Sequence, residues 1–184
     1  MVSLGEAYNK VDEKIVGDTY IINGPAQSGK TSLVYWALRN DGEKTVIATI
    51  DCSLYRTDIQ FIQKLTREVG EKLGVPNLDK RAIASENIKF SELNEVIRQA
   101  GRHLVLLIRN AERLVEFRKQ ILLYNLLEWI ATDIKEYVGL VFTTRLIYFV
   151  DRFEKRVRSR LAAKHLTVLR PTLESLIKLL IRRV

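Results

Sequence analysis

Residues 24–31 read Gly-Pro-Ala-Gln-Ser-Gly-Lys-Thr, which matches the pattern G-x-x-x-x-G-K-[ST] at every fixed position. The short β-prone segment Thr19–Asn23 precedes this stretch, and residues 31–39 after it have the composition of a helix. A glycine-rich loop between a strand and a helix can fold its backbone amides around an anion, at the positive end of the helix dipole. The pattern therefore predicts a phosphate-binding loop, and it requires a fold in which a strand leads directly into a helix.

Each residue type in such a loop has its own task. The glycines allow the backbone to bend around a phosphate, the lysine reaches the β- and γ-phosphates of a purine nucleotide, and the threonine hydroxyl ligates Mg²⁺. We therefore predict ATP and Mg²⁺ as cofactors, with Thr31 as the metal ligand. The residues predicted to hold the nucleotide are Gly24, Pro25, Ala26, Gln27, Ser28, Gly29, Lys30 and Thr31.

Strand-like and helix-like segments alternate along the rest of the chain. The further candidate strands are residues 44–51, 104–108, 137–144 and 165–169, and the further candidate helices are residues 57–73, 90–102, 116–134 and 172–183. The segment 104–108 is apolar throughout, as expected for a strand buried on both faces. This alternation predicts an α/β fold with a parallel sheet covered by helices.

The acidic residues of an efficient ATPase are missing where they are expected. Such an enzyme needs acids after a second apolar strand, one to hold Mg²⁺ and one to polarise the attacking water. The chain carries Arg109 and Asn110 there, and neither can replace these carboxylates. The nearest acids are Glu112, which we expect to be a surface or capping residue, and Asp51 after an earlier strand. Nucleotide binding is therefore expected with weak hydrolysis.

The candidate strand 137–144 ends in Thr143 and Thr144. In ATPases of this architecture a polar residue at this position senses the γ-phosphate. Either hydroxyl could do so, and equally both could simply close the strand. We include Thr144 in the predicted nucleotide site.

Positive charge is concentrated at the C-terminal end of the chain. The net charge is +8, and the last 40 residues hold 11 Lys and Arg against 3 Asp and Glu. This asymmetry indicates a polyanion or an acidic partner, with a solvated basic helix as the plainer alternative. Arg156 and Arg160 are four residues apart and are expected to share one helix face, whereas Arg158 points elsewhere. Paired guanidinium groups suit a phosphate, either a neighbouring subunit's γ-phosphate or a DNA backbone.

These features in combination resemble the AAA+ ATPases of the initiator clade, which are found in the origin recognition complex. The residues that carry the resemblance are the loop 24–31, the strand end Thr143-Thr144-Arg145-Leu146 and the stretch Glu154–Leu161. The resemblance spans residues 15–181 and is strongest over 120–161. It implies a five-stranded parallel sheet of order 5-1-4-3-2 between helices.

The resemblance also implies a domain division and a role. Residues 1–171 would form the AAA+ nucleotide-binding domain and 172–184 the start of a helical lid, with the rest of the lid and the winged helix absent. The chain would bind ATP, hydrolyse it weakly, and supply Arg160 and Arg156 as an arginine finger to a neighbouring ATPase subunit during helicase loading. The implied partners are other subunits of the complex, especially the first and fifth, and double-stranded origin DNA. The implied location is the nucleus.

Two other functions remain open at this stage. A self-sufficient small P-loop ATPase or kinase would need an acid near Mg²⁺, and only Asp51 or Glu112 could serve. A direct nucleic-acid-binding module would use the basic C-terminal third, and its affinity would fall steeply with salt. No apolar run approaches the length of a membrane span, so no membrane partner is expected.

Overall fold

A parallel sheet forms the centre of the computed structural model, which describes residues 15–39, 44–75, 90–116, 120–170 and 172. Its strands are β1 (Thr19–Asn23), β2 (Thr45–Asp51), β3 (His103–Arg109), β4 (Val138–Thr144) and β5 (Lys164–Thr167). They lie in the order β2-β3-β4-β1-β5, and every neighbouring pair is parallel. Read from the other edge, this is the predicted order 5-1-4-3-2, so the predicted fold class is confirmed.

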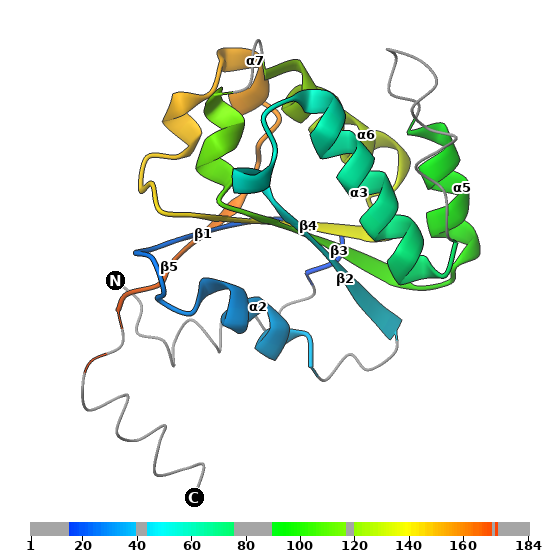
Figure 1. Cartoon of the computed structure of the whole chain (residues 1–184), viewed down its shortest axis with the longest axis horizontal. Coiled ribbons are helices and arrows are strands. Elements are labelled where there is room, and N and C mark those ends of the chain that lie inside the picture. The colour runs from blue at the N-terminus through cyan, green and yellow to red at the C-terminus, as the bar shows by residue number, and fades with distance from the viewer. Residues whose placement is uncertain (1–14, 40–43, 76–89, 117–119, 171, 173–184) are drawn as a thin grey trace, which may run out of the picture.

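Helices cover both faces of the sheet (Figure 1). The helix α2 (Lys30–Ala37) lies on one face, and α3 (Asp58–Leu73), α5 (Ser91–Gln99) and α6 (Ile121–Asp133) lie on the other. The remaining helical segments are α7 (Lys155–Arg158) and the 3₁₀ turns η2 (Cys52–Leu54), η3 (Ala111–Glu116) and η5 (Val150–Arg152). In the described part of the chain, no helix has both the length and the apolar character needed to cross a bilayer.

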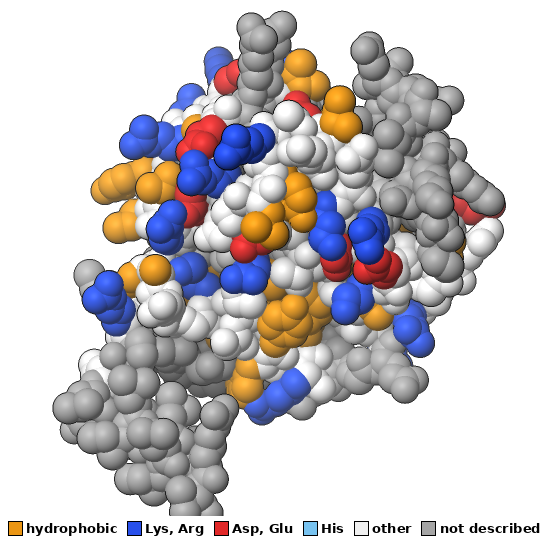
Figure 2. All heavy atoms as spheres, viewed as in Figure 1, with side chains coloured by type: hydrophobic (Ala, Val, Ile, Leu, Met, Phe, Trp, Pro, Cys, Tyr) orange, Lys and Arg blue, Asp and Glu red, His pale blue; other side chains and the backbone are white. Residues whose placement is uncertain are grey.

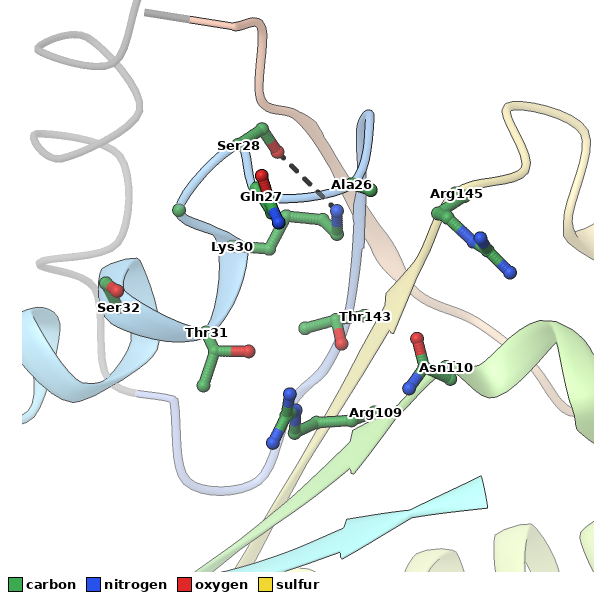
Figure 3. A pocket seen from close by; sticks show the side chains of 11 residues that line it. Ala26, Gln27, Ser28, Lys30, Thr31, Ser32, Arg109, Asn110, Thr143 and Arg145 are labelled. Atoms are coloured by element: carbon green, nitrogen blue, oxygen red, sulfur yellow. Dashed lines mark hydrogen bonds between the residues drawn. The ribbon is translucent and has the colours of Figure 1, made fainter. Parts of the chain in front are cut away.

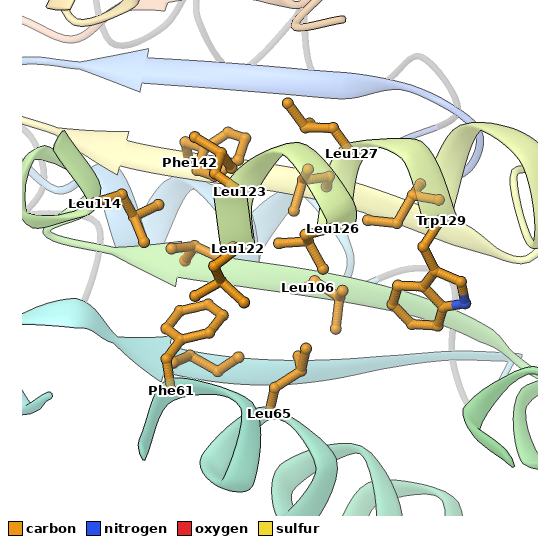
Figure 4. Packing of buried hydrophobic residues seen from close by; sticks show 14 of the residues in the cluster. Phe61, Leu65, Leu106, Leu114, Leu122, Leu123, Leu126, Leu127, Trp129 and Phe142 are labelled. Atoms are coloured by element: carbon orange, nitrogen blue, oxygen red, sulfur yellow. The ribbon is translucent and has the colours of Figure 1, made fainter. Parts of the chain in front are cut away.

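The alternation of side chains along the strands explains this layered arrangement. In β3, Leu106 belongs to a core shared with α3 and α6, and Leu107 belongs to a second core on the α2 side. Figure 4 shows the larger core, where Phe61, Leu122 and Leu126 pack around Leu106. Burial on both faces requires a strand that is apolar throughout, which is what the sequence of β3 provides.

Several predicted boundaries differ from the structure, most of them by one to three residues, as for the helix predicted over 90–102, which spans Ser91–Gln99. The helix predicted over 116–134 starts only at Ile121, because Gln120 has φ 48° and this left-handed conformation cannot continue a helix. The Gln120 side chain instead accepts a hydrogen bond from the backbone N of Glu154 (2.9 Å) and so ties the start of α6 to the start of α7. The last strand spans Lys164–Thr167 rather than 165–169. The helix predicted over 172–183, which includes the proposed start of a lid, lies outside the described residues except for Thr172.

Candidate nucleotide-binding site

The predicted phosphate loop connects β1 to α2 at the carboxyl ends of the strands. The backbone N of Gly24 donates to the carbonyl of Thr144 at the end of β4 (3.1 Å), which fixes where the loop leaves the sheet. Gly29 is the N-cap residue of α2 and has φ 87°, a conformation that glycine adopts without strain. The strand–loop–helix context predicted for the motif is therefore present.

A cavity of about 360 Å³ lies between this loop and the ends of β3 and β4 (Figure 3). Six of the eight predicted loop residues line it. The full lining consists of Ala26, Gln27, Ser28, Gly29, Lys30, Thr31, Ser32, Arg109, Asn110, Thr143 and Arg145. The volume and the position at the carboxyl edge of a parallel sheet suit a small-molecule site.

Lys30 is held inside the loop by the loop's own backbone. Its Nζ donates to the carbonyl oxygens of Gly24 (2.9 Å) and Pro25 (2.6 Å). Burial lowers the pKa of Lys30, the nearby Glu112 carboxylate opposes this shift, and Arg145 reinforces it. A lysine in this position can exchange two carbonyl partners for phosphate oxygens without moving far, which is what the predicted role requires.

Gly24 is needed because two backbone segments approach each other closely at this point. A Cβ atom at Gly24 would lie 2.2 Å from the carbonyl oxygen of Val168, just after β5. We expect Gly24→Ala to lower the free energy of unfolding by about 2 kcal/mol, because the backbone must shift to relieve the overlap. Denaturant unfolding measures this change.

Gly29→Ala is the matched control for that prediction. A Cβ at Gly29 meets nothing within 4 Å, so the substitution adds only the strain of a left-handed alanine, about 1 kcal/mol. Gly24→Ala should therefore be the less stable of the two variants. Equal stability would show that the end of β5 does not constrain the loop.

Arg109 and Asn110 stand at the end of β3, where acids are expected in an ATPase. Figure 3 shows the Arg109 side chain extending from the strand end toward Thr31. Its Nη2 lies 3.9 Å from Oδ2 of Asp51, the last residue of β2. Asn110 has φ 50°, and its Nδ2 donates to Oδ1 of the same carboxylate (2.7 Å).

Asp51 is fixed by hydrogen bonds from the turn that follows it. The backbone N and the Oγ of Ser53 both donate to its Oδ1, at 3.0 and 2.6 Å. Burial raises the pKa of Asp51, but the hydrogen bonds from Ser53 and Asn110 outweigh burial, and the net pKa lies below its usual value. Asp51 is therefore ionised at neutral pH, and its carboxylate stabilises the turn after β2 and the position of Asn110 by accepting their hydrogen bonds.

Of the two roles expected for Glu112, surface residue or cap, the first is wrong. Its side chain is 11% exposed, and its Oε1 accepts a hydrogen bond from Nε of Arg145 at 2.8 Å. Burial raises the pKa of Glu112, but hydrogen bonds from Arg145 and Thr144 outweigh it and the net shift is downward. Glu112 thus balances Arg145, a pocket residue to which the sequence had assigned no role.

The two threonines at the end of β4 have different positions. Thr143 lines the cavity, whereas the Oγ1 of Thr144 accepts a hydrogen bond from the backbone N of Leu146 (3.1 Å). This differs from the prediction, which placed Thr144 in the nucleotide site. Side chains alternate along a strand, so only one of the two neighbours can face the cavity.

The cavity is strongly cationic. Lys30, Arg109 and Arg145 line it, and no carboxylate among the described residues does. Within the described ranges no cluster of three His, Cys, Asp or Glu side chains could hold a metal ion. A Mg²⁺ ion at the Thr31 hydroxyl would face the Arg109 guanidinium, which repels it. The residues present therefore do not fit a Mg²⁺ site supported by protein carboxylates.

Arg156 and Arg160 lie outside this cavity. The helix α7 ends at Arg158, so Arg160 follows the helix and the predicted shared helix face is wrong. The two guanidinium groups nevertheless converge on one ring of α6, with their Cζ atoms 5.8 and 4.2 Å from the ring centre of Tyr124. Arg160 also forms an ion pair with Glu128 of α6. Figure 2 shows Lys and Arg side chains gathered over this part of the surface.

Among known proteins, solved structures share the fold of this chain at low sequence identity. No protein-family model matches the sequence, and no curated protein matches it significantly. Three similar solved structures are an ORC2 protein of Aeropyrum pernix in ADPNP–ADP complexes (13% identity, TM-score 0.74), an ORC1 protein of Aeropyrum pernix in complex with DNA (18%, 0.71), and Drosophila ORC bound to DNA (16%, 0.62).

These matches cover 97%, 96% and 97% of this chain but only 50%, 48% and 44% of the other chains, so the chain spans about half their length. With the five-stranded order and the phosphate loop, they show the fold. The chain has the P-loop α/β fold of AAA+ proteins, in the form shared by origin recognition and Cdc6 proteins.

Proposed function

We propose that the chain is an ATP-binding subunit of an origin recognition complex that hydrolyses ATP weakly or not at all. The observation that carries the proposal is a phosphate-loop cavity in which Arg109 occupies the place of the catalytic acids. Lys30 and the loop amides remain placed for the β- and γ-phosphates. The nucleotide complexes of the ORC2 protein with the same fold support ATP as the ligand. The Mg²⁺ predicted at Thr31 would receive only a hydroxyl there, with no carboxylate beside it.

Within such a complex, the sequence most resembles the fourth subunit. In that subunit a Thr-Cys-Arg-Leu strand end precedes a Glu-Lys-Arg-Val-Lys-Ser-Arg run, similar to residues 143–146 and 154–160 here. The stretch Ala111–Leu114 resembles the fifth subunit instead. We assign the chain to the fourth subunit because the longer resemblance includes both proposed finger arginines.

The proposed partners follow from where the basic residues lie. Arg156 and Arg160 are exposed, and neither lines the chain's own cavity. The helix α7, which carries Arg156, lies on the face of the sheet opposite α2 (Figure 1). In a ring of subunits the two arginines would complete the ATP site of a neighbour, for which we propose the first subunit. The DNA complexes of proteins with this fold support DNA as a partner of the assembly. Its setting would be helicase loading at replication origins in the nucleus.

A self-sufficient ATPase or kinase is the competing function, and turnover by the isolated chain separates the two. We expect the purified protein to bind ATP but release phosphate no faster than a buffer blank, because Asp51 and Glu112 are both engaged in structural contacts. Steady-state phosphate release measures this. Brisk turnover that disappears in Glu112→Gln would contradict the proposal, since it would identify a working general base.

The assembly itself is tested by binding to the other subunits. The purified chain is mixed with each of the other five subunits in turn, with and without ATP, and captured complexes are identified. Stable capture of the first and fifth subunits is the expected result. Failure with all five would contradict the subunit assignment and leave nucleotide binding untouched.

A further inference from the structure

We infer that Arg109 supplies in this pocket the positive charge that Mg²⁺ supplies in other phosphate-loop sites, so that the nucleotide binds without a divalent cation. The inference rests on the proposed nucleotide binding and adds to it the form of the ligand, a metal-free nucleoside di- or triphosphate. It replaces the expectation of Mg²⁺ at Thr31.

The position of Arg109 is the first observation. Its side chain leaves the end of β3, lines the cavity and extends toward Thr31, the residue predicted to ligate the metal (Figure 3). A guanidinium group has five N–H donors in a rigid plane and binds phosphate oxygens through two parallel hydrogen bonds. It can therefore neutralise the β- and γ-phosphate oxygens that a metal ion would otherwise bridge.

The second observation concerns Asp51, the carboxylate at the end of the neighbouring strand β2. Asp51 forms a 3.9 Å ion pair with Arg109, which is longer than a hydrogen bond, so the pair orients the guanidinium without occupying its donors. Hydrogen bonds from Asn110 and Ser53 hold the carboxylate in place. The carboxylate of Asp51 thus positions the Arg109 guanidinium and is not directed at a metal site.

The charge balance of the cavity is the third observation. Its lining carries Lys30, Arg109 and Arg145 and no carboxylate among the described residues. Glu112 pairs directly with Arg145, and Asp51 lies 3.9 Å from Arg109, so Lys30 is the cation of the lining that makes no direct ion pair with either carboxylate. A nucleoside triphosphate without metal is more negative than its Mg²⁺ complex. The metal-free form is therefore the better electrostatic match, since free Mg²⁺ would compete with the protein for the same phosphate oxygens.

The test is a calorimetric titration of ATP and ADP into the full chain, in buffer with Mg²⁺ and in buffer with EDTA. For the wild type we expect an affinity in EDTA that is equal to or tighter than that in Mg²⁺. Arg109→Ala should weaken binding in EDTA by about tenfold or more, because a charge-assisted phosphate contact is lost. Arg109→Asp should make binding depend on Mg²⁺, because it supplies a carboxylate near Thr31.

Two further variants keep the test decisive. Arg109→Gln covers the case in which Arg109→Asp unfolds through repulsion from Asp51, and it should lose affinity in EDTA as the alanine variant does. Arg113→Ala is the matched control, because Arg113 pairs with Glu116 on the surface and does not line the cavity, so its affinities should equal the wild type's.

The outcomes separate this inference from the proposed function. Wild-type binding that weakens tenfold or more in EDTA would overturn the inference, as would full EDTA affinity in a folded Arg109→Ala variant. Absence of binding in both buffers would instead contradict nucleotide binding itself.

Discussion

Lys30→Ala is expected to weaken ATP binding by roughly 100-fold, whether or not a divalent cation is present. The ammonium group lies at the centre of the loop, within hydrogen-bonding distance of the carbonyls of Gly24 and Pro25. It is the flexible cation that can follow the β- and γ-phosphates, and each of its charge-assisted bonds contributes about 1.5–3 kcal/mol. Alanine removes all of these contacts and leaves only the loop amides and the two arginines.

The loss should concern binding and not folding. The bonds that Lys30 makes are to the loop itself, so the sheet and its two cores do not depend on them. A nucleotide titration measures the affinity, and thermal unfolding without nucleotide checks the fold. Lys72→Ala, an exposed lysine in the last turn of α3, is the control and should bind ATP as the wild type does. Equal affinity in Lys30→Ala would refute the phosphate-loop assignment.

The parts of the site that are local in sequence could be predicted, because a phosphate loop is one continuous segment. The strand before the loop Gly24–Thr31 and the helix after it are adjacent in sequence, so the whole context of the motif can be recognised locally. The contacts of Arg109 and Arg145 are of another kind, since they join strand ends far apart in the chain. Asp51 and Arg109 are register partners at the ends of β2 and β3. The resemblance supplied that strand order, so this pairing could have been inferred from it.

The helix boundaries depended on contacts that no local pattern reveals. Gln120 stops α6 from extending backward because of its left-handed backbone, yet glutamine has no preference for that conformation. Its side chain is used to bind the backbone of Glu154, 34 residues later. In the same way, a four-residue spacing favours a shared helix face only while the helix continues, and α7 ends after Arg158. The start of α6 therefore coincides with a tertiary contact that the local sequence does not reveal.

Arg160→Ala is expected to leave this chain's own ATP binding unchanged and to lower ATP hydrolysis by the assembled complex by about 10³-fold. Arg160 does not line the chain's own cavity, so nothing in that site changes. In a neighbour's site, a finger arginine neutralises charge that develops on the transferred phosphoryl group, and the alanine variant loses this contact. Two contacts orient the Arg160 guanidinium: the Tyr124 ring, whose centre lies 4.2 Å from Cζ, and the ion pair with Glu128.

If Arg160 had a purely structural role, the variants would differ in ATPase activity in another way. Glu128→Gln removes the charged partner but keeps the arginine, so it should reproduce the effect of Arg160→Ala only if the ion pair itself is what matters. Under the finger assignment, Glu128→Gln retains most of the complex's activity, and Arg158→Ala, at the exposed last residue of α7, retains all of it. Steady-state phosphate release by the reconstituted complex, at matched assembly, measures each variant. Full activity with Arg160→Ala would show that these arginines form only a basic surface, because loss of a transition-state contact cannot leave the rate unchanged.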